Sequence, residues 1–329
     1  MTEVHVIVPE GIDDPARPSG GNTYDRRVCD GLAALGWAVH RHVVADAAAL
    51  AHALRRIPDG AVVLLDGLIA SPAPEALVPH AARLRQVVLV HMPLADRRER
   101  EVLAAAAAVV TTSEWARGRL EELYGVAAHV AEPGVDAAGL ARGTAAGAEL
   151  LCVAAVTPGK GHDVLLDGLG TVGDLPWRCT CVGSLDRDPA FAADVQRHAL
   201  RGRVRFVGPR TGADLDRAYA AADLLVLASH AETYGMVVTE ALARGVPVVA
   251  TDVGGVPEAL GHGAGLLVPP GNPAALGAAL RRWLGDAELR GRLRRAARDR
   301  RASLRGWPAT TADLAGVLEG VGALSGAAR

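Results

Sequence analysis

The sequence contains few aromatic residues and almost no net charge, and both shortages narrow the range of functions. Phe, Trp and Tyr make up only 3% of the chain, so a nucleic-acid surface built from stacked rings is not expected. The formal net charge is −2, so no overall electrostatic attraction draws the chain towards nucleic acid or a membrane. These shortages exclude classes of function without indicating one.

Cysteine pairs with the spacing of zinc sites are also missing. The four cysteines are Cys29, Cys152, Cys179 and Cys181, and none forms a Cys-x2-Cys pair. Cys179 and Cys181 share one face of an expected strand, where we expect them to be small buried hydrophobic side chains. We therefore expect no metal site, no disulfide framework and a reducing compartment.

The chain also lacks the signals of export or membrane insertion. The longest apolar run, Val102 to Val110, is about half as long as a bilayer span. The N-terminus carries Glu3 and no basic region, which indicates a first strand rather than a signal peptide. These features predict a cytoplasmic protein.

Short apolar runs alternate with helical stretches from end to end, and their number and order predict the fold. In the first half the expected strands are Val4–Pro9, Ala38–Val44, Ala61–Asp66, Gln86–His91, Ala107–Thr111 and His129–Ala131. In the second half they are Glu149–Val153, Arg178–Val182, Val204–Gly208, Leu224–Ala228, Pro247–Thr251 and Gly265–Val268. Continuous apolar strands separated by helices are typical of parallel sheets covered on both faces.

This pattern predicts an α/β protein with two Rossmann-like, doubly wound parallel-sheet domains, which suits its 329 residues. The first domain is expected over residues 1–142 and the second over 148–305, joined by a segment rich in Gly and Ala. Ligands bind at the carboxyl ends of parallel strands, so we expect the two domains to face each other across a cleft. The loops at these ends are Pro18–Asn22, His91–Asp96, Thr157–Gly161 and His230–Met236.

Two of these loops have the character of anion sites. Gly20 and Gly21 open a helix, where backbone N–H groups approach an anion, although a plain flexible loop fits the sequence equally well. Lys160 lies between glycines where another helix begins, and it would meet a phosphate or be a solvated lysine in a turn. Neither loop matches the dinucleotide fingerprint or the P-loop, which disfavours a nicotinamide dehydrogenase and ATP hydrolysis.

A third loop places two carboxylates beside a helix N-terminus. Glu232 precedes the helix that begins after Gly235, and Glu240 lies within it. Carboxylates accept hydrogen bonds from hydroxyls, which suits a sugar and a ribose on either side of a diphosphate. Spacing alone is weak support, because two glutamates of an expected surface helix, Glu114 and Glu122, have the same separation.

The string from Glu232 to Glu240, with Gly245–Glu258 and Gly265–Asn272, closely resembles the donor domain of family 4 retaining glycosyltransferases. The resemblance implies the GT-B architecture of two Rossmann-like domains and covers most of the chain. It also implies that a terminal helix after Trp307, at 308–329, packs back on the first domain.

The resemblance implies His91, Lys160 and Glu232 as catalytic residues, with His91 beside the transferred sugar, Lys160 on the diphosphate and Glu232 on sugar hydroxyls. The donor-binding residues that it implies are Gly20, Gly21, Arg210, Tyr234, Gly235, Met236, Val237 and Glu240, the last on the ribose. One position departs from the family: an Arg usually lies five residues before the Lys, and here that residue is Ala155. Arg210 would then be a substitute partner for the diphosphate.

The implied function is retaining transfer of a hexose-type sugar from a UDP- or GDP-type nucleotide sugar to a hydroxyl acceptor. No cofactor or metal is expected, and the partners are the donor and a small-molecule, glycan or lipid acceptor, with no nucleic acid. Two alternatives stay open: a phosphorylase or hydrolysing epimerase of the same fold, and a non-catalytic nucleotide-sugar-binding protein.

The segment Arg281–Arg305 carries ten arginines against three acidic residues. This surplus would allow peripheral contact with anionic lipid head groups. Leu284, Leu289 and Leu293 give the stretch an apolar helical face, which favours a solvated arginine face opposite to it.

Overall fold

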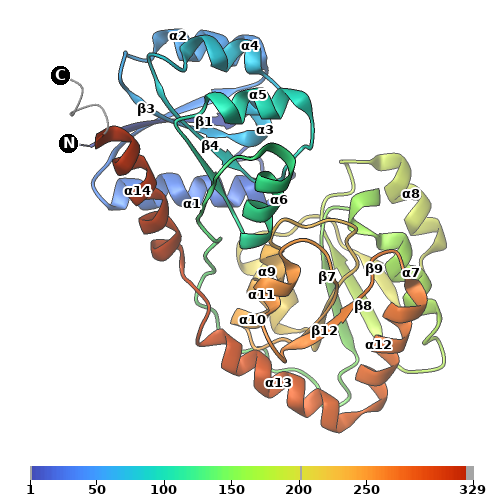
Figure 1. The fold of residues 1–329 in the computed structure, drawn as a ribbon. Helices are drawn as coiled ribbons and strands as arrows, with labels where there is room; N and C mark the ends of the chain where they lie inside the picture. The colour runs from blue at the N-terminus through green and yellow to red at the C-terminus, as the bar shows by residue number, and fades with distance from the viewer. Residues whose placement is uncertain (1, 201, 324–329) are drawn as a thin grey trace. The chain divides into compact units, whose positions relative to one another are not determined.

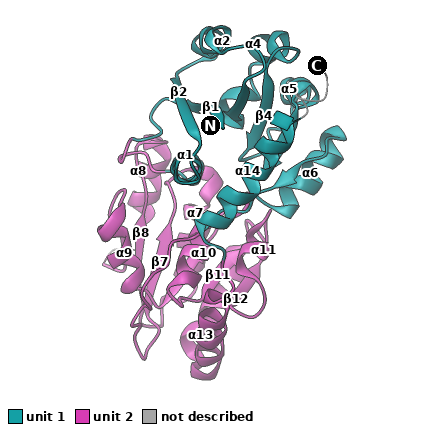
Figure 2. Cartoon of the chain, turned by 90° about the vertical axis from the view of Figure 1, so that its left-hand side faces the viewer, with its two compact units in different colours: residues 1–13, 19–134, 305–329 teal, residues 14–18, 135–304 magenta. Residues whose placement is uncertain are grey.

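The computed structural model describes residues 2–200 and 202–323, which form two compact units (Figures 1 and 2). Unit 1 comprises the chain up to residue 13, residues 19–134, and the chain from 305 onward, whereas unit 2 comprises residues 14–18 and 135–304. The chain thus leaves unit 1 at Gly134, earlier than the expected end at 142, and returns to it near the expected position.

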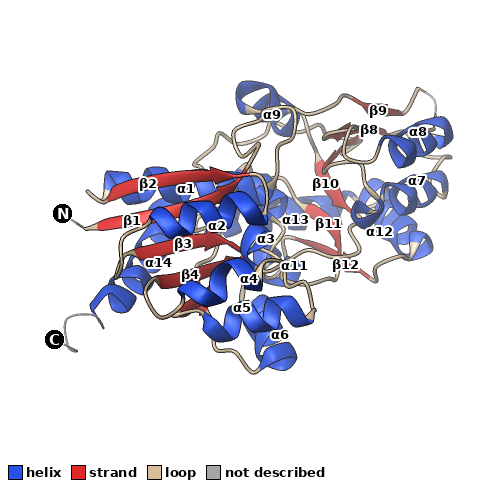
Figure 3. Ribbon diagram, turned by 90° about the horizontal axis from the view of Figure 1, so that it is seen from above, coloured by secondary structure: helices blue, strands red, loops and turns tan. Residues whose placement is uncertain are grey.

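Unit 1 is built on a parallel six-stranded sheet with the order β2-β1-β3-β4-β5-β6 (Figure 3). Its strands are β1 (Glu3–Pro9), β2 (Ala38–Val44), β3 (Val62–Asp66), β4 (Arg85–Val90), β5 (Ala108–Thr111) and β6 (His129–Val130). The strand order reverses at β1, which pairs with β2 on one side and β3 on the other. In such sheets the ligand crevice lies at the carboxyl ends of the strands at this reversal.

The helices of unit 1 cover both faces of its sheet. They are α1 (Gly20–Ala34), α2 (Ala47–Arg56), α3 (Gly67–Ala70), α4 (Pro74–Leu77), α5 (Arg97–Ala105), α6 (Glu114–Tyr124) and α14 (Trp307–Ala323), with a 3-10 turn η1 (Val78–His80). α14 packs against α1 and contacts β3, β4 and β5 (Figure 1). Residues 324–329 of the expected terminal helix lie outside the described residues.

Unit 2 contains the second parallel sheet, with the order β12-β11-β10-β7-β8-β9. Its strands are β7 (Glu149–Val153), β8 (Arg178–Val182), β9 (Val204–Phe206), β10 (Leu224–Leu227), β11 (Val248–Thr251) and β12 (Gly265–Val268). Here the order reverses between β7 and β10, which pair directly through Leu150 and Leu224.

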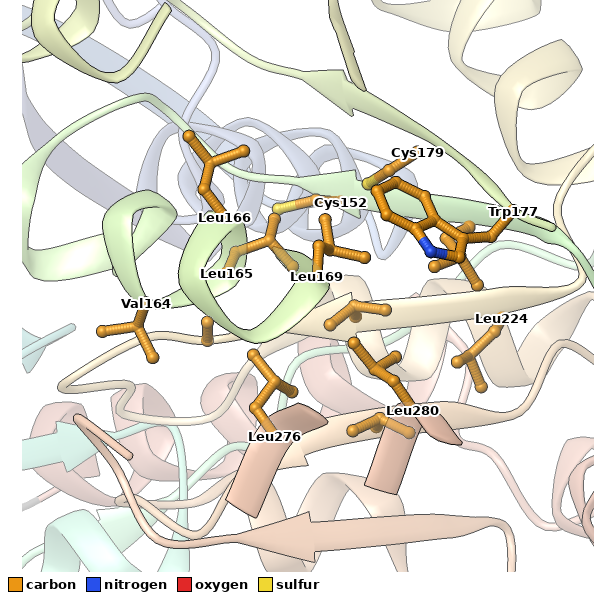
Figure 4. Close-up of a cluster of buried hydrophobic side chains, with 14 of the residues drawn as sticks. Cys152, Val164, Leu165, Leu166, Leu169, Trp177, Cys179, Leu224, Leu276 and Leu280 are labelled. Atoms are coloured by element: carbon orange, nitrogen blue, oxygen red, sulfur yellow. The ribbon is translucent and has the colours of Figure 1, made fainter. Parts of the chain in front are cut away.

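Two buried clusters hold the helices of unit 2 onto the faces of its sheet. The helices are α7 (His162–Gly170), α8 (Pro189–His198), α9 (Gly212–Ala220), α10 (Met236–Ala243), α11 (Val256–Leu260), α12 (Pro273–Gly285) and α13 (Ala287–Arg301), with η2 (Pro158–Lys160). Figure 4 shows one cluster, in which Leu165 of α7 and Leu280 of α12 pack over Cys152 and Leu224 of the sheet. The second cluster joins α9, α10 and α11 to the opposite face.

The predicted fold class is confirmed: both sheets are parallel, and all twelve expected strands are present within two residues at each end. The strands were recognisable because both of their faces are buried, so their apolar residues run continuously. In β10, for example, every residue from Leu224 to Leu227 is buried.

The arginine-rich segment 281–305 has the two faces that its sequence predicts. The apolar face of α13 is confirmed, since Leu289 and Leu293 are buried. The solvated arginine face is confirmed for most of the segment, because seven of its ten arginines are exposed and the other three are half-buried. One of the half-buried residues, Arg290, donates to the carbonyls of Trp283 and Leu284.

Within the described part of the chain, no helix combines the length and the apolar character needed to cross a bilayer.

Candidate functional site

The implied site residues form two groups, each within one unit, and the pair of Lys160 and Glu232 is central to the group in unit 2. Lys160 follows β7 and Glu232 follows β10, so they lie on either side of the point where the strand order reverses. The Lys160 Nζ donates to Glu232 Oε1 at 2.6 Å. A charge pair at this point lies in the expected ligand crevice of a doubly wound sheet.

The turn that presents Lys160 is fastened to the loop after β10. Gly161 has a φ of 63°, and a Cβ there would lie 2.1 Å from the carbonyl oxygen of Ala228, so only glycine fits without rearrangement. The His230 N–H also donates to the Gly159 carbonyl at 2.9 Å. These contacts hold the turn that carries Lys160 in a defined position against the loop that carries Glu232.

The Glu232 carboxylate has a second support that the sequence reasoning missed. Ser229 Oγ donates to Glu232 Oε1 at 2.8 Å, and Thr251 Oγ1 donates to the Ser229 carbonyl at 2.6 Å. Ser229 is fully buried at the end of β10, where a lone serine after an apolar strand carries no special pattern in the sequence. The network orients Glu232 before any ligand arrives.

The helix after this loop combines an anion-binding end with a buried carboxylate. Gly235 is the N-cap of α10 and Met236 begins it, as the sequence predicts, and the first N–H groups of a helix have no acceptor within it. Tyr219 Oη donates to Glu240 Oε2 at 2.7 Å. Burial raises the pKa of Glu240 even though the Tyr219 hydrogen bond opposes this.

The structure also describes the surroundings of two further implied donor-binding residues, Tyr234 and Arg210. Tyr234 is buried in the cluster that includes Val238 and Val256. Arg210 is exposed between β9 and α9, and its guanidinium donates to the neighbouring Pro209 carbonyl at 3.2 Å. Their part in donor binding stays a prediction.

The Asp188 side chain accepts from the Phe191 N–H at 3.0 Å as the N-cap of α8.

In unit 1, His91 lies at the end of β4 against two buried carboxylates that the sequence reasoning missed. His91 Nε2 lies 2.8 Å from Asp25 Oδ1, and Asp66 at the end of β3 completes a group of three within 4.8 Å. The backbone of Gly21 lies against the imidazole ring, because a Cβ there would be 3.4 Å from His91 Cδ2. Three segments far apart in the sequence thus meet at one edge of the sheet.

The two carboxylates set the charge of His91. Burial alone would lower the pKa of His91, but the Asp25 carboxylate outweighs it and raises the pKa to about 9. Burial raises the pKa of Asp66 to about 7, and a protonated Asp66 would donate to the otherwise unpartnered Oδ2 of Asp25. At neutral pH the imidazole is therefore a cation with its Nδ1–H as a further donor.

Comparison with solved structures identifies the class of the fold. Sucrose-phosphate synthase from Thermosynechococcus elongatus superposes with a TM-score of 0.81 at 21% identity, covering 98% of this chain and all of that one. Anabaena HepE in complex with UDP-glucose gives a TM-score of 0.78 at 18% identity over 97% of this chain and all of that one. The fold is therefore that of the GT-B glycosyltransferases.

The family follows from the sequence of unit 2. Residues 146–300 match the family model described as "Glycosyl transferases group 1", so this segment belongs to that family and the resemblance to family 4 glycosyltransferases is confirmed. The D-inositol 3-phosphate glycosyltransferase of Jonesia denitrificans is 32% identical over 249 residues, and that of Kineococcus radiotolerans is 36% identical over 248.

Each alignment covers only part of this chain and part of the relative. They include 67% and 64% of this chain, and 58% and 57% of the respective relatives. The chain thus spans less than two thirds of the length of these curated relatives.

Proposed function

We propose that the chain is a retaining glycosyltransferase that moves a hexose-type sugar from a UDP- or GDP-type nucleotide sugar to a hydroxyl acceptor. The observation that carries this proposal is the ion pair of Lys160 and Glu232, held across the strand-order reversal of unit 2. It supplies a cation for phosphate and a carboxylate for sugar hydroxyls at one place.

Lys160 is the only lysine in the sequence, since every other basic side chain apart from histidine is an arginine. A lysine ammonium has three donors, so Nζ can keep its hydrogen bond to Glu232 and still donate to a phosphate oxygen. In the proposal the diphosphate lies between Lys160 and the N–H groups of Gly235, Met236 and Val237. Glu240 accepts from the ribose, and Arg210 and the backbone near Tyr234 add contacts.

The proposed reaction breaks the bond between the anomeric carbon and the phosphate oxygen and forms one to the acceptor oxygen on the same face. The transition state resembles an oxocarbenium ion. The acceptor proton passes to the departing phosphate, so no protein carboxylate needs to act as nucleophile. Negative charge grows on that phosphate, and Lys160 and the end of α10 stabilise it more strongly than in the ground state.

His91 is proposed to contact the transferred sugar, and Gly20 and Gly21 the phosphate. Its positive charge, maintained by Asp25, makes the Nδ1–H a stronger donor than a neutral imidazole would be. We propose that transfer itself needs no added metal, because Lys160 supplies a cation for the leaving phosphate. Equal rates with and without Mg²⁺ or Mn²⁺ are expected.

The test begins with the donor and ends with the anomeric configuration of the product. A thermal-shift panel of UDP- and GDP-sugars identifies the donor, since a ligand at 100 times its Kd adds about 2.7 kcal/mol to stability. The selected donor is then incubated with hydroxyl acceptors, beginning with D-inositol 3-phosphate because of the relatives' names. We expect release of the nucleoside diphosphate and an NMR spectrum of the product with the donor's anomeric configuration.

Each alternative activity gives a different result in the same assay. Conversion of the sugar without an acceptor would indicate an epimerase, and sugar 1-phosphate formation that requires inorganic phosphate would indicate a phosphorylase. Inverted product, or donor binding without turnover across the acceptor panel, would contradict the proposal.

A further inference from the structure

Unit 2 contains a buried cluster of sulfur and nitrogen donors that the proposed transfer reaction does not use. Cys152, His162 and Cys181 place one potential ligand atom each within 4.8 Å of the others. The Cys152 Sγ and the His162 Nε2 are 3.8 Å apart. All three side chains are at most 2% exposed, so bulk solvent does not satisfy them.

The sheet register brings the two sulfurs together. Cys152 on β7 and Cys181 on β8 are direct partners in this parallel pair, so their side chains point to the same face. His162 is the first residue of α7, which packs on that face with Leu165 beside Cys152 (Figure 4). The donors lie 10 and 19 residues apart along the chain, a spacing that no zinc-site pattern contains.

The histidine has poor hydrogen bonding for a buried polar side chain. His162 Nδ1 is buried with no hydrogen-bond partner, and its other ring nitrogen faces only a sulfur, a weak partner. A metal ion bound to Nε2 and the two sulfurs would replace this weak contact with coordinate bonds.

A further cysteine lies on the same strand as Cys181. Cys179 lies two residues before Cys181 on the same face of β8 and is buried as well.

We propose that Cys152, His162 and Cys181 form a structural site for a thiophilic divalent cation, with Zn²⁺ as the preferred ion. Thiolate and imidazole ligands select zinc over Mg²⁺ or Ca²⁺. With Zn–S bonds of about 2.3 Å and Zn–N bonds of about 2.0 Å, tetrahedral ligands lie about 3.5 Å apart, close to the 3.8 Å between sulfur and nitrogen. Cys179 lies outside this group of three and would have to move closer to supply a fourth ligand.

The site would stabilise the turn that carries Lys160. His162 follows Lys160 by two residues, and Cys152 precedes the same turn on β7. A metal that ties the start of α7 to β7 and β8 therefore limits how far Lys160 moves from Glu232. The metal proposal itself does not depend on the glycosyl-transfer proposal, because it concerns binding rather than activity.

The test uses the full-length protein expressed in medium supplemented with Zn²⁺ or Co²⁺. We expect about one equivalent of zinc by elemental analysis, and for the cobalt protein the intense visible bands and thiolate charge-transfer absorption of a tetrahedral site. Cys152→Ser and Cys181→Ser should each remove the charge-transfer band or weaken metal binding by at least about 10-fold. Cys29→Ser, which changes a buried cysteine in unit 1, should leave the spectrum unchanged.

X-ray absorption on the wild-type zinc protein provides a readout that does not depend on the folding of variants. The proposal requires two or three sulfur scatterers and at least one nitrogen around the zinc. Absence of zinc and cobalt from the folded protein would overturn it, as would a shell of oxygen and nitrogen only. Charge-transfer bands that persist in both folded cysteine variants would do the same.

Discussion

Lys160 is held in place by a single carboxylate, so its substitution tests the donor site at one residue. Lys160→Met should raise the barrier for transfer by about 2–4 kcal/mol, a 30- to 1,000-fold loss in kcat, because the leaving phosphate loses its cation. Steady-state release of the nucleoside diphosphate measures the effect. Unchanged kcat would remove Lys160 from the reaction.

Matched variants separate charge at the site from charge in general. Arg197→Ala removes an exposed cation from α8 and should leave kcat unchanged.

Since Lys160 is the only lysine, ¹³C reductive methylation labels this side chain alone besides the N-terminus. The nucleotide should shift its NMR signal or protect it from methylation.

His91 should titrate far above an ordinary histidine. NMR of the imidazole is expected to give a pKa of about 9, and Asp25→Asn should lower it towards or below 6.5, because burial then dominates. A pKa in the wild type near 6.5 would show that Asp25 does not hold the charge on His91.

The same raised pKa predicts how stability depends on pH. The contribution of the His91–Asp25 pair is complete below about pH 6.5 and is lost as pH rises through about 9. The loss amounts to roughly 2–4 kcal/mol, measured by urea unfolding at pH 7 and 9.5. The pKa of Asp66 is raised to about 7, so its contribution to stability falls as pH rises towards 7. Above pH 7 the decrease in stability comes from the His91–Asp25 pair, and Asp25→Asn should make it smaller.

At the scale of an element, α5 is anchored by one fully buried carboxylate. Glu99 accepts from the Leu94 and Ala95 N–H groups at 2.7 and 3.2 Å, and from Ser71 Oγ and Tyr124 Oη at 3.0 and 2.6 Å. Ala95 has a φ of 62°, unusual for a residue with a Cβ, so these bonds hold a strained loop next to His91.

Glu99→Ala should therefore lower the free energy of unfolding by about 2–5 kcal/mol, because it leaves several buried donors without an acceptor. Equilibrium urea unfolding measures the change. Glu101→Ala on the same helix removes only a surface pair with Arg97 and should cost less than about 1 kcal/mol. Equal effects of the two substitutions would contradict the role of Glu99.

At the scale of the whole molecule, the described segments 2–13 and 305–323 both belong to unit 1. Gly134 lies where the chain that leaves unit 1 contacts the segment that returns to it. A Cβ at Gly134 would be 2.3 Å from the backbone nitrogen of Trp307. Nearby, Thr310 Oγ1 donates to the Glu132 carbonyl at 2.7 Å, and the Tyr24 and Trp307 rings are 5.8 Å apart. The attachment of α14 thus depends on close backbone approach at this point.

Gly134→Ala should destabilise unit 1 by about 1–3 kcal/mol, because backbone has to move to accept the methyl group. Hydrogen exchange followed by mass spectrometry should show faster exchange in α14 and α1, with peptides of unit 2 unchanged. Gly118→Ala, whose Cβ meets nothing within 4 Å in α6, serves as the control and should not destabilise. Equally faster hydrogen exchange in both units would contradict a local effect of Gly134 on unit 1.

The sequence alone is enough to locate the twelve strands, the helix starts at Gly20 and Met236, and the loops that carry Lys160 and Glu232. These features are local: continuous apolar runs mark strands buried on both faces, and glycines and caps mark where helices begin. The parallel type of the sheets and the ends of the strands follow from this pattern without knowledge of which strands pair.

The tertiary structure alone decided the contacts between segments distant along the chain. Asp25 of α1 and Asp66 meet His91, Lys160 meets Glu232, and Cys181 meets Cys152 only because the strand order brings their segments together. Periodicity shows which residues are buried but not which strands are neighbours. Hydrophobic burial is non-directional, so an apolar strand can bury its side chains beside any other apolar strand.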